Sequence, residues 1–460
     1  MNLKNKLIKI RLTERQKNQI YSHLYPGDGL EAACLAICGR AGTAEEEIMI
    51  FQEIILIPYE KCTRTEVNVT WSTDIVEPYM DKIDKEDLAL IKLHSHPNGY
   101  NRFSQFDDES DVDFLGSIFS YTDGIRPHAS LVMLPNGKFI SRAITPNLKF
   151  EKVDSIMIVG DSIDFQFHDS HNTIDEAINL RNIQTLGSGT TKLLSELKIG
   201  VVGCSGTGSL IIEFLNRLNT GCLVIADPKK MELRNLNRIV NSRLKHATDA
   251  VYKVEIFENA GNENGFDTKF IAIPDKIEAV GTIKHLSRCD LIFGCVDTAL
   301  GRHYINQIST YYTIPIFDIG VGIEQVNGTT AINTIDCAVN YVQPGESFIK
   351  RRIFSALELA DEELQFSNPA LYEQKVRDGY ISNVDSPAVI SINASISSLG
   401  TNEFLSRIHD LKPYENSLYN KLSLSLTEFE LDRDFIDGFT EKMTNKIGLG
   451  DRPTLIGLIS

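Results

Sequence analysis

Cysteine is scarce in this chain, and none of its cysteines form a Cys-x-x-Cys pair. Eight cysteines among 460 residues do not make a disulfide-stapled scaffold. No apolar run approaches the ~18 residues that a membrane-spanning helix needs. The first fifteen residues are basic, but their apolar stretch, Leu7–Ile10, is too short for a signal peptide. These absences predict a reduced, cytoplasmic protein with no membrane partner.

Positive charge is also in short supply. The chain has 46 Lys and Arg against 62 Asp and Glu, a net charge of −16. Because phosphate contacts need clustered cations, we do not expect a nucleic-acid partner. Hydrophobic residues make up 42% and charged residues 23%, as in ordinary globular proteins, so a mainly disordered chain is excluded. At ~150 residues per domain, the length predicts two large domains or three smaller ones.

The first region, up to about residue 165, has apolar runs of strand length and one segment with helical spacing. The expected strands are Ala32–Ile37, Ile48–Ile57, Leu88–Leu93 and Ala129–Leu134, and the expected helix is Asp111–Ser120. The polar stretch Phe167–Asn179 is typical of a linker that leads into a helix. We therefore predict separate domains over residues 1–165 and 181–460, joined by a linker over residues 166–180.

The second region begins with the pattern of a βαβ unit. A strand (Lys198–Val202), a glycine-rich turn, a helix (Leu210–Leu218) and a strand (Cys222–Ala226) follow one another, which predicts a parallel sheet. Later strands are expected at Leu291–Phe293, Ile314–Phe317 and Thr330–Val339, and helices at Phe354–Val376 and Pro387–Leu405. Both regions therefore belong to the α/β class.

A possible metal site lies at the end of the strand Leu88–Leu93. His94 and His96 are two residues apart, so both imidazoles can lie on one face. Ser104 and Asp107 follow at the start of a helix, where Asp107 can supply a third ligand. Taken alone, His-x-His is common at strand ends, and Ser-x-x-Asp is by default a helix capping box. Three protein ligands and a water would form an open, catalytic zinc site, with water activated near neutral pH.

The full pattern, His-x-His-x7-Ser-x-x-Asp, resembles the JAMM signature of the JAB/MPN metalloproteases. The segment from Gly29 to Ala36 is similar to the first strand of that family, which starts with a glutamate. The resemblance implies that Glu31 is the general base, that His94, His96 and Asp107 bind zinc, and that Ser104 donates to the oxyanion. It also implies cleavage of peptide or isopeptide bonds at the C-terminus of ubiquitin-like proteins, a deubiquitinase-like hydrolase activity.

A possible nucleotide site lies in the βαβ unit. Gly203, Gly206 and Gly208 lie between strand and helix, where the backbone can approach a phosphate, and Asp227 ends the next strand, where an acid can hold a ribose. This pattern alone fits an NAD dehydrogenase about as well, and Ser205 stands at a usual glycine position. A triphosphate with Mg²⁺ is favoured by four later residues: Asn235, Arg238, Lys253 and Asp297.

Together these residues resemble the ubiquitin-activating-enzyme superfamily, which includes the ThiF and MoeB adenylyltransferases. The resemblance implies a Rossmann-like doubly wound domain that uses ATP, with Mg²⁺ on Asp297. Arg181 is similar to an arginine that reaches into the neighbouring subunit, which implies a homodimer. Lys229 replaces a second acid of the family, and the paired Cys-x-x-Cys motifs of its structural zinc are absent.

The thioester cysteine of the family's conjugating members is also missing, because residues 346–386 contain no cysteine. Cys337 lies in the expected strand Thr330–Val339, and Cys204, Cys289 and Cys295 are expected to fill the core. We therefore expect a bifunctional enzyme that cleaves at, and adenylates, the C-terminus of a ubiquitin-like protein, as in fusions encoded in bacterial ubiquitin-like operons. A conjugating-enzyme-like protein is then a possible partner. The alternatives are a sulfur-carrier pathway with a sulfurtransferase partner, and a non-catalytic scaffold.

Overall fold

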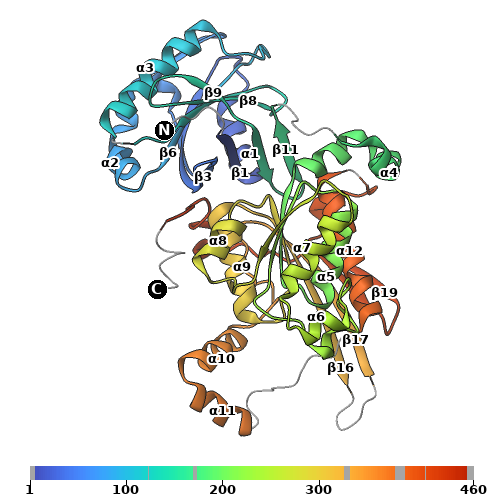
Figure 1. The fold of residues 1–460 in the computed structure, drawn as a ribbon. Coiled ribbons are helices and arrows are strands. Elements are labelled where there is room, and N and C mark those ends of the chain that lie inside the picture. The colour runs from blue at the N-terminus through green and yellow to red at the C-terminus, as the bar shows by residue number, and fades with distance from the viewer. Residues whose placement is uncertain are drawn as a thin grey trace.

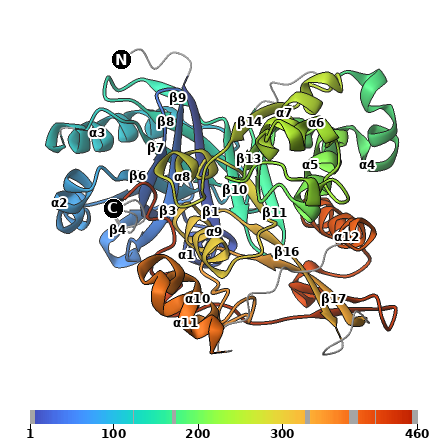
Figure 2. The ribbon, with the colours of Figure 1, turned by 60° about the horizontal axis from the view of Figure 1, so that its bottom comes forward.

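The computed structural model describes residues 6–122, 124–168, 174–325, 332–378, 389–409 and 411–452. Two sheets, each covered by helices, lie one above the other in Figure 1, and the view of Figure 2 shows the helices that flank them. Among the described residues, no helix combines the length and the apolar character needed to cross a membrane.

The first sheet has the strand order β11-β10-β1-β3-β2-β6-β7-β8-β9. Its strands are β1 (Leu7–Thr13), β2 (Ala33–Gly42), β3 (Glu46–Leu56), β6 (Ala89–Ser95), β7 (His128–Met133), β8 (Phe139–Ile144), β9 (Phe150–Lys152), β10 (Ser155–Val159) and β11 (Ile163–Phe167). The four expected strands are confirmed within a few residues. The strand β1 was not predicted; it pairs in parallel with both β3 and β10. Its alternating Lys and Arg residues obscured a strand that is buried by its partners.

Helices and a short hairpin cover the first sheet. They are α1 (Glu14–Leu24), α2 (Glu77–Lys85), α3 (Gln105–Tyr121), the 3-10 turns η1 (Tyr59–Lys61) and η2 (Thr73–Ile75), and the pair β4 (Cys62–Arg64) and β5 (Val69–Trp71). The helix α3 starts six residues before the expected Asp111, because Ser104 and Asp107 form a capping box at its N-terminus.

The second sheet has the order β14-β13-β12-β15-β16-β17-β18-β19. Its strands are β12 (Lys198–Val202), β13 (Cys222–Ala226), β14 (Lys269–Ile273), β15 (Leu291–Gly294), β16 (Ile316–Gln325), β17 (Ile332–Val342), β18 (Lys421–Ser425) and β19 (Glu430–Asp434). The strands from β14 to β16 run parallel, and those from β17 to β19 continue the sheet in antiparallel fashion. The predicted parallel βαβ unit is confirmed.

The helices of this half are α4 (Glu176–Glu196), α5 (Gly206–Arg217), α6 (Leu244–Thr248), α7 (Lys253–Glu263), α8 (Val280–Leu286), α9 (Ala299–Tyr312), α10 (Ala356–Ser367), α11 (Pro369–Arg377), α12 (Ile390–Ile408) and α13 (Glu441–Thr444), with the turns η3 (Leu233–Asn235) and η4 (Asn416–Leu418). The single helix expected over Phe354–Val376 is wrong. Asn368 caps a second helix whose first residue is Pro369, because proline disfavours helical geometry in the residue before it. The α10–α11 pair projects from the body (Figure 1).

The predicted linker, residues 166–180, overlaps regular structure at both of its ends. The strand β11 extends to Phe167, and α4 starts at Glu176. Residues 169–173 of the expected linker lie outside the described residues.

The two halves are not separate, because a buried arginine joins them. Arg11 on β1 is 1% exposed, and its guanidinium donates hydrogen bonds to the backbone oxygens of Ser287, Cys289 and Tyr312 in the second half, at 2.9–3.1 Å. Its Nη2 atom also lies 3.9 Å from an oxygen of Asp290. A guanidinium has only donors, so buried carbonyls and carboxylates are the partners that it requires.

An apolar seam and the end of the described chain add to this interface. Ala41, Ile48 and Ile50 of the first sheet are buried in the same cluster as residues of β12, β15 and β16. The segment from Gly448 to Arg452 runs back to β2, where Arg40 and Gly450 form a β-bridge. A Cβ atom at Gly39 would lie 2.1 Å from the carbonyl oxygen of Gly448, so the close approach requires glycine. The two halves are therefore packed against each other, and the predicted domain bounds, residues 1–165 and 181–460, stay a prediction.

We expect the Arg11→Met variant to lower the free energy of unfolding of the whole chain by about 3 kcal/mol, because it leaves three buried carbonyl groups without their hydrogen-bond donor. The measurement is urea denaturation followed by circular dichroism. The matched control is Arg15→Met at an exposed position, which should change stability by less than about 0.5 kcal/mol. Equal stability of the two variants would contradict the role assigned to Arg11.

Candidate functional site

The expected metal ligands are brought together at one end of the first sheet. His94 lies on β6, His96 follows its last residue, and Asp107 lies in the first turn of α3. All three are buried, and their ligand atoms lie within 4.8 Å of one another. A strand end and a helix start, about ten residues apart in sequence, thus place three ligand side chains around one point.

The distances fit a shared cation. The Nε2 atoms of His94 and His96 are 3.1 Å apart, and they lie 3.0 and 3.6 Å from the two oxygens of Asp107. The Nδ1 atom of His96 is 2.7 Å from the carbonyl oxygen of Tyr100. If Nδ1 carries the proton and donates it there, the lone pair of a neutral His96 lies on Nε2. Two imidazole nitrogens and one carboxylate match the donor set that Zn²⁺ takes.

The side chain of His94 is buried. Its Nδ1 atom is buried and has no hydrogen-bond partner among the described residues, so the ring of His94 is held by packing and by the contact of Nε2 with Asp107. Burial lowers the pKa of His94, which favours the neutral, ligating form. Burial opposes ionisation of Asp107, but hydrogen bonds from His94 and His96 hold the pKa of its carboxyl well below the usual range. The cluster thus favours neutral imidazole on His94 and a charged carboxylate on Asp107.

Glu31 lies beside this cluster, with Oε1 4.0 Å from Nε2 of His96. Burial raises the pKa of Glu31 to about 7; the charge of His96 opposes this shift, and that of Asp107 adds to it. Its backbone is fixed by the β4–β5 hairpin, because Arg64 donates to the carbonyl of Glu31 at 2.7 Å and the N–H of Glu31 donates to Thr65. A carboxyl with a pKa near neutral can both accept and return a proton.

Ser104 performs the capping role. Its hydroxyl donates to an oxygen of Asp107 at 2.8 Å and accepts the N–H of Asp107 at 3.2 Å. It therefore orients one metal-ligand candidate, and its predicted contact with an oxyanion stays a prediction.

The glycine-rich turn of the second half packs against the end of a neighbouring strand. Gly203 has φ +92°, and a Cβ atom there would lie 2.5 Å from the carbonyl oxygen of Cys295. A Cβ atom at Gly208 would meet the carbonyl of Gly203 at 1.8 Å. The glycines thus let α5 begin close to the carboxyl ends of β12 and β15.

Asp227 ties this turn to the next strand. Its two carboxylate oxygens accept the backbone N–H groups of Cys204 and Lys229, each at 2.8 Å, and the ammonium of Lys253 lies 4.0 Å away. Both Asp227 and Lys253 are buried. The carboxylate therefore has a structural task in addition to the predicted contact with a ribose.

The other expected nucleotide residues lie around the same edge. Asn235 is buried and its side-chain oxygen accepts the N–H of Glu232, whereas Arg238 is half-buried and donates to the carbonyl of Arg234. Asp297 follows β15 and is exposed. These residues follow or approach the carboxyl ends of parallel strands, where ligands bind in open α/β sheets.

The first turn of α5 fits a phosphate. Asn393 on α12 is 3% exposed, and its Nδ2 atom has no hydrogen-bond partner in the part of the chain that the structure describes. A Cβ atom at Gly206, the first residue of α5, would lie 2.2 Å from that nitrogen. A buried free donor beside a helix N-terminus suits an anion. Asn393 was not predicted as a site residue, because it is far from the turn in sequence.

Two more polar groups near Asp297 were missed. Arg302 on α9 pairs with Asp318 at 3.0 Å, and Glu362 on α10 accepts the N–H groups of Ala299 and Leu300 at the start of α9. Arg302 could have been found from the sequence, because it lies about one helical turn beyond Asp297. Arg181 is exposed on α4 and its guanidinium donates to Gln184 of the same helix.

Parallel strands, a glycine-rich turn and polar residues at the carboxyl edge define the second half as a Rossmann-like α/β domain of the nucleotide-binding type. The chain belongs to the ThiF family, whose model matches residues 177–417. The resemblance to ThiF-type proteins that the sequence indicated is confirmed for this half.

Curated relatives match the same region. "Ubiquitin-like modifier-activating enzyme 5" of Culex quinquefasciatus is 27% identical over 164 residues, 33% of this chain and 38% of that protein. "Adenylyltransferase and sulfurtransferase UBA4" of Meyerozyma guilliermondii is 26% identical over 137 residues, 29% of this chain and 31% of that protein. The chain thus spans about a third of the length of these relatives.

Among solved structures, Escherichia coli MccB with ATP is 14% identical and covers 59% of this chain and 74% of its own, with a TM-score of 0.42.

We expect the purified chain to bind one Zn²⁺, and the double variant His94→Ala/His96→Ala to lose it, because two of three ligands are removed. The measurement is metal content by mass spectrometry after dialysis against zinc. His246→Ala, in the second half, is the matched control and should keep the ion. The assignment would be overturned if the double variant retained as much zinc as the unaltered chain.

Proposed function

We propose that this protein is a bifunctional enzyme acting on ubiquitin-like carrier proteins. The second half adenylates the C-terminal carboxylate of the carrier with ATP, and the first half is a JAB/MPN-type zinc metallopeptidase that cleaves a peptide or isopeptide bond after that C-terminus. Membership of the ThiF family supports the first activity. The convergence of His94, His96 and Asp107 beside Glu31 supports the second.

Adenylation requires groups that balance the negative charge of the reacting phosphates. The carboxylate oxygen of the carrier attacks the α-phosphorus, and pyrophosphate leaves, so negative charge must be balanced near the α5 turn. Lys253 and Arg238 are the proposed cations, and the amide of Asn393 adds a neutral donor. Asp297 is the proposed ligand of Mg²⁺, because it is an exposed carboxylate at the strand end.

Hydrolysis requires a general base beside the metal-ligand cluster. Zinc, when bound, lowers the pKa of a water to about 7 and polarises a carbonyl. Glu31 would accept the water's proton and return it to the leaving amine, which suits a carboxyl with a raised pKa. Arg64 is a positioning residue for Glu31, because it holds the backbone of that residue.

The fate of the acyl-adenylate depends on a thiol or amine from outside the chain. Cys337 is buried on β17, and burial raises its pKa to about 11, so it is a poor nucleophile near neutral pH. The eight cysteines are all free, and most are buried. This environment supports transfer to an external acceptor, such as a conjugating enzyme or a sulfurtransferase.

A homodimer follows from the proposed role of Arg181. That guanidinium lies exposed at the surface of α4, where a second copy could receive it in its ATP site. Sedimentation of the Arg181→Ala variant and its rate of pyrophosphate exchange would separate assembly from catalysis.

We expect Glu31→Gln to retain zinc and to lose at least 100-fold in cleavage of a carrier fusion, because the variant removes a proton acceptor and no metal ligand. The measurement is electrophoresis of a ubiquitin-like protein fused through its C-terminus to a reporter. Glu60→Gln, outside the cluster, is the matched control. Undiminished cleavage by Glu31→Gln would assign the base to another group.

We expect Asp297→Ala and Arg238→Ala each to abolish carrier-dependent exchange of radiolabelled pyrophosphate into ATP, since each removes charge compensation. Zinc content and cleavage should persist in both variants. Arg217→Ala, at the far end of α5, is the matched control. Exchange that survives both changes would show that the nucleotide lies elsewhere.

A further inference from the structure

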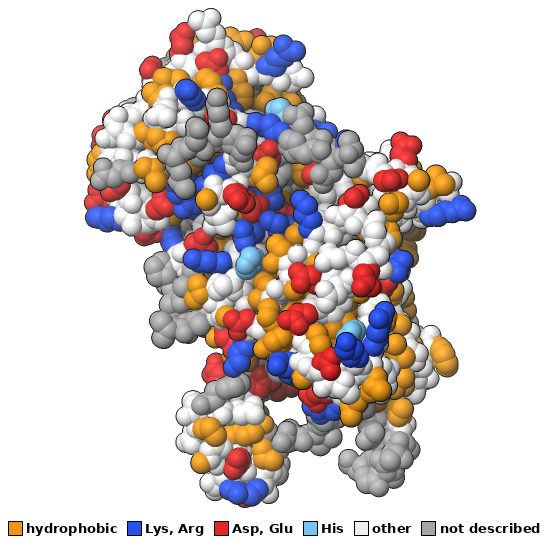
Figure 3. Space-filling view, in the orientation of Figure 1, with side chains coloured by type: hydrophobic (Ala, Val, Ile, Leu, Met, Phe, Trp, Pro, Cys, Tyr) orange, Lys and Arg blue, Asp and Glu red, His pale blue; other side chains and the backbone are white. Residues whose placement is uncertain are grey.

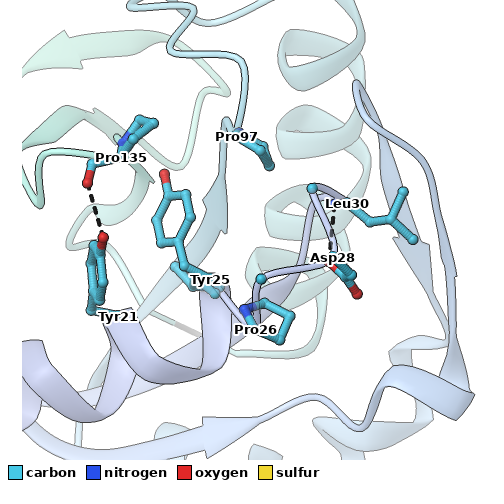
Figure 4. A pocket seen from close by; sticks show the side chains of 10 residues that line it. Tyr21, Tyr25, Pro26, Asp28, Leu30, Pro97 and Pro135 are labelled. Carbon is cyan, nitrogen blue, oxygen red and sulfur yellow. Dashed lines mark hydrogen bonds between the residues drawn. The ribbon is translucent and has the colours of Figure 1, made fainter.

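A pocket of about 370 Å³ lies next to the metal-ligand cluster, within the ~300–1,000 Å³ range of small-ligand sites. It is formed by the end of α1, the loop before Glu31 and the turns after β6 and β7. Its defining residues are Tyr21, Tyr25, Pro26, Leu30, Pro97 and Pro135, and we call it the tyrosine–proline pocket (Figure 4).

Two chain segments join this pocket directly to the cluster. Leu30 lines the pocket and Glu31 faces the cluster; Pro97 lines the pocket and His96 faces the cluster. The pocket and the ligand cluster therefore share the same two pieces of backbone.

A hydrogen-bonded carbonyl reinforces this connection. The carbonyl oxygen of Met133 accepts the hydroxyl of Tyr25 at 2.6 Å and the backbone N–H of His96 at 3.1 Å. The side chain of Tyr25 in the pocket wall and the backbone of His96 thus share one hydrogen-bond acceptor. A group seated against Tyr25 lies at the edge of the metal-ligand cluster.

The chemistry of the lining selects an uncharged occupant. The hydroxyl of Tyr21 donates to Pro135 at 3.0 Å, so both tyrosines present ring surface with their hydroxyls already engaged. Asp28, the charged residue of the lining, is paired with Arg64 at 2.8 Å. In Figure 4 the two tyrosine rings lie along one side and Leu30 lies on the other.

The space at the cluster itself is far smaller. The cavity lined by Trp71, Phe106, His94 and Asp107 holds about 10 Å³, roughly the space of one water. Of these two cavities, only the tyrosine–proline pocket has the volume of a substrate side chain.

We propose that the tyrosine–proline pocket is a specificity subsite that binds an apolar or aromatic side chain of the polypeptide substrate, close to the bond that is cleaved. This inference rests on the proposed peptidase function of the first half. The occupant is part of the substrate chain, because the pocket opens beside the groups proposed to act on that chain.

Binding can be tested without turnover, on the zinc-free full-length protein. The probes are acetyl-Gly-Gly-Phe-Gly-Gly-amide and the same peptide with Asp in place of Phe, measured by ligand-observed NMR titration. We expect the Phe peptide to bind at least ten-fold more tightly, because it buries an aromatic ring. Leu30→Lys should weaken binding of the Phe peptide and strengthen binding of the Asp peptide. Ile125 is exposed and precedes the first residue of β7, whereas the pocket lies beyond the last one. The control variant Ile125→Lys should therefore change the affinity for neither peptide.

Location is tested with a photoreactive benzoylphenylalanine in place of Phe. We expect adducts on Tyr25, Leu30 or Pro97, mapped by mass spectrometry. Adducts confined to other surfaces, or equal binding of both peptides to the Leu30→Lys variant and the unaltered chain, would overturn the subsite. Absence of cleavage of every carrier fusion by the zinc-loaded protein would instead overturn the proposed peptidase, and the binding result distinguishes the two failures.

Discussion

The buried guanidinium of Arg11 requires acceptors that its own half does not provide. Its hydrogen bonds go to the carbonyls of Ser287, Cys289 and Tyr312, which belong to the second half. A buried cation without these partners would cost several kcal/mol. The first sheet can therefore keep Arg11 on β1 only while the second half is folded against it, and the apolar residues Ile48 and Ile50 are buried by the same contact. Two recognisable regions thus form one structure.

The sequence predicted those features that depend on short-range pattern. The parallel strands β12 and β13 lie where their apolar runs indicated, since buried parallel strands read as continuous apolar segments. The metal-ligand cluster could also be predicted from short-range pattern. Its three candidate ligands, His94, His96 and Asp107, lie at one strand end and one helix start.

Features that depend on distant partners escaped prediction. The charged residues of β1 made it look unlike a strand, and only the acceptors near residues 287–312 explain why Arg11 can be buried there. Asn393 is almost two hundred residues from Gly206, so no spacing rule connects them. The tyrosine–proline pocket likewise combines the end of α1 with turns that follow β6 and β7. In each case the missing information was the contact itself.

The direction of the strands sets the relation between the two proposed sites. The interface uses Lys198 at the start of β12, Asp290 just before β15 and Tyr312 before β16, all at the amino-terminal edge of the parallel strands. The glycine-rich turn and Asp297 lie at the opposite, carboxyl edge.

In the first sheet, Glu46 at the start of β3 contacts Lys198, whereas His94 lies near the end of β6. The strands β3 and β6 are parallel, since both pair antiparallel with β2. Both proposed sites therefore lie at the strand ends opposite those that contribute Glu46 and Lys198 to the interface.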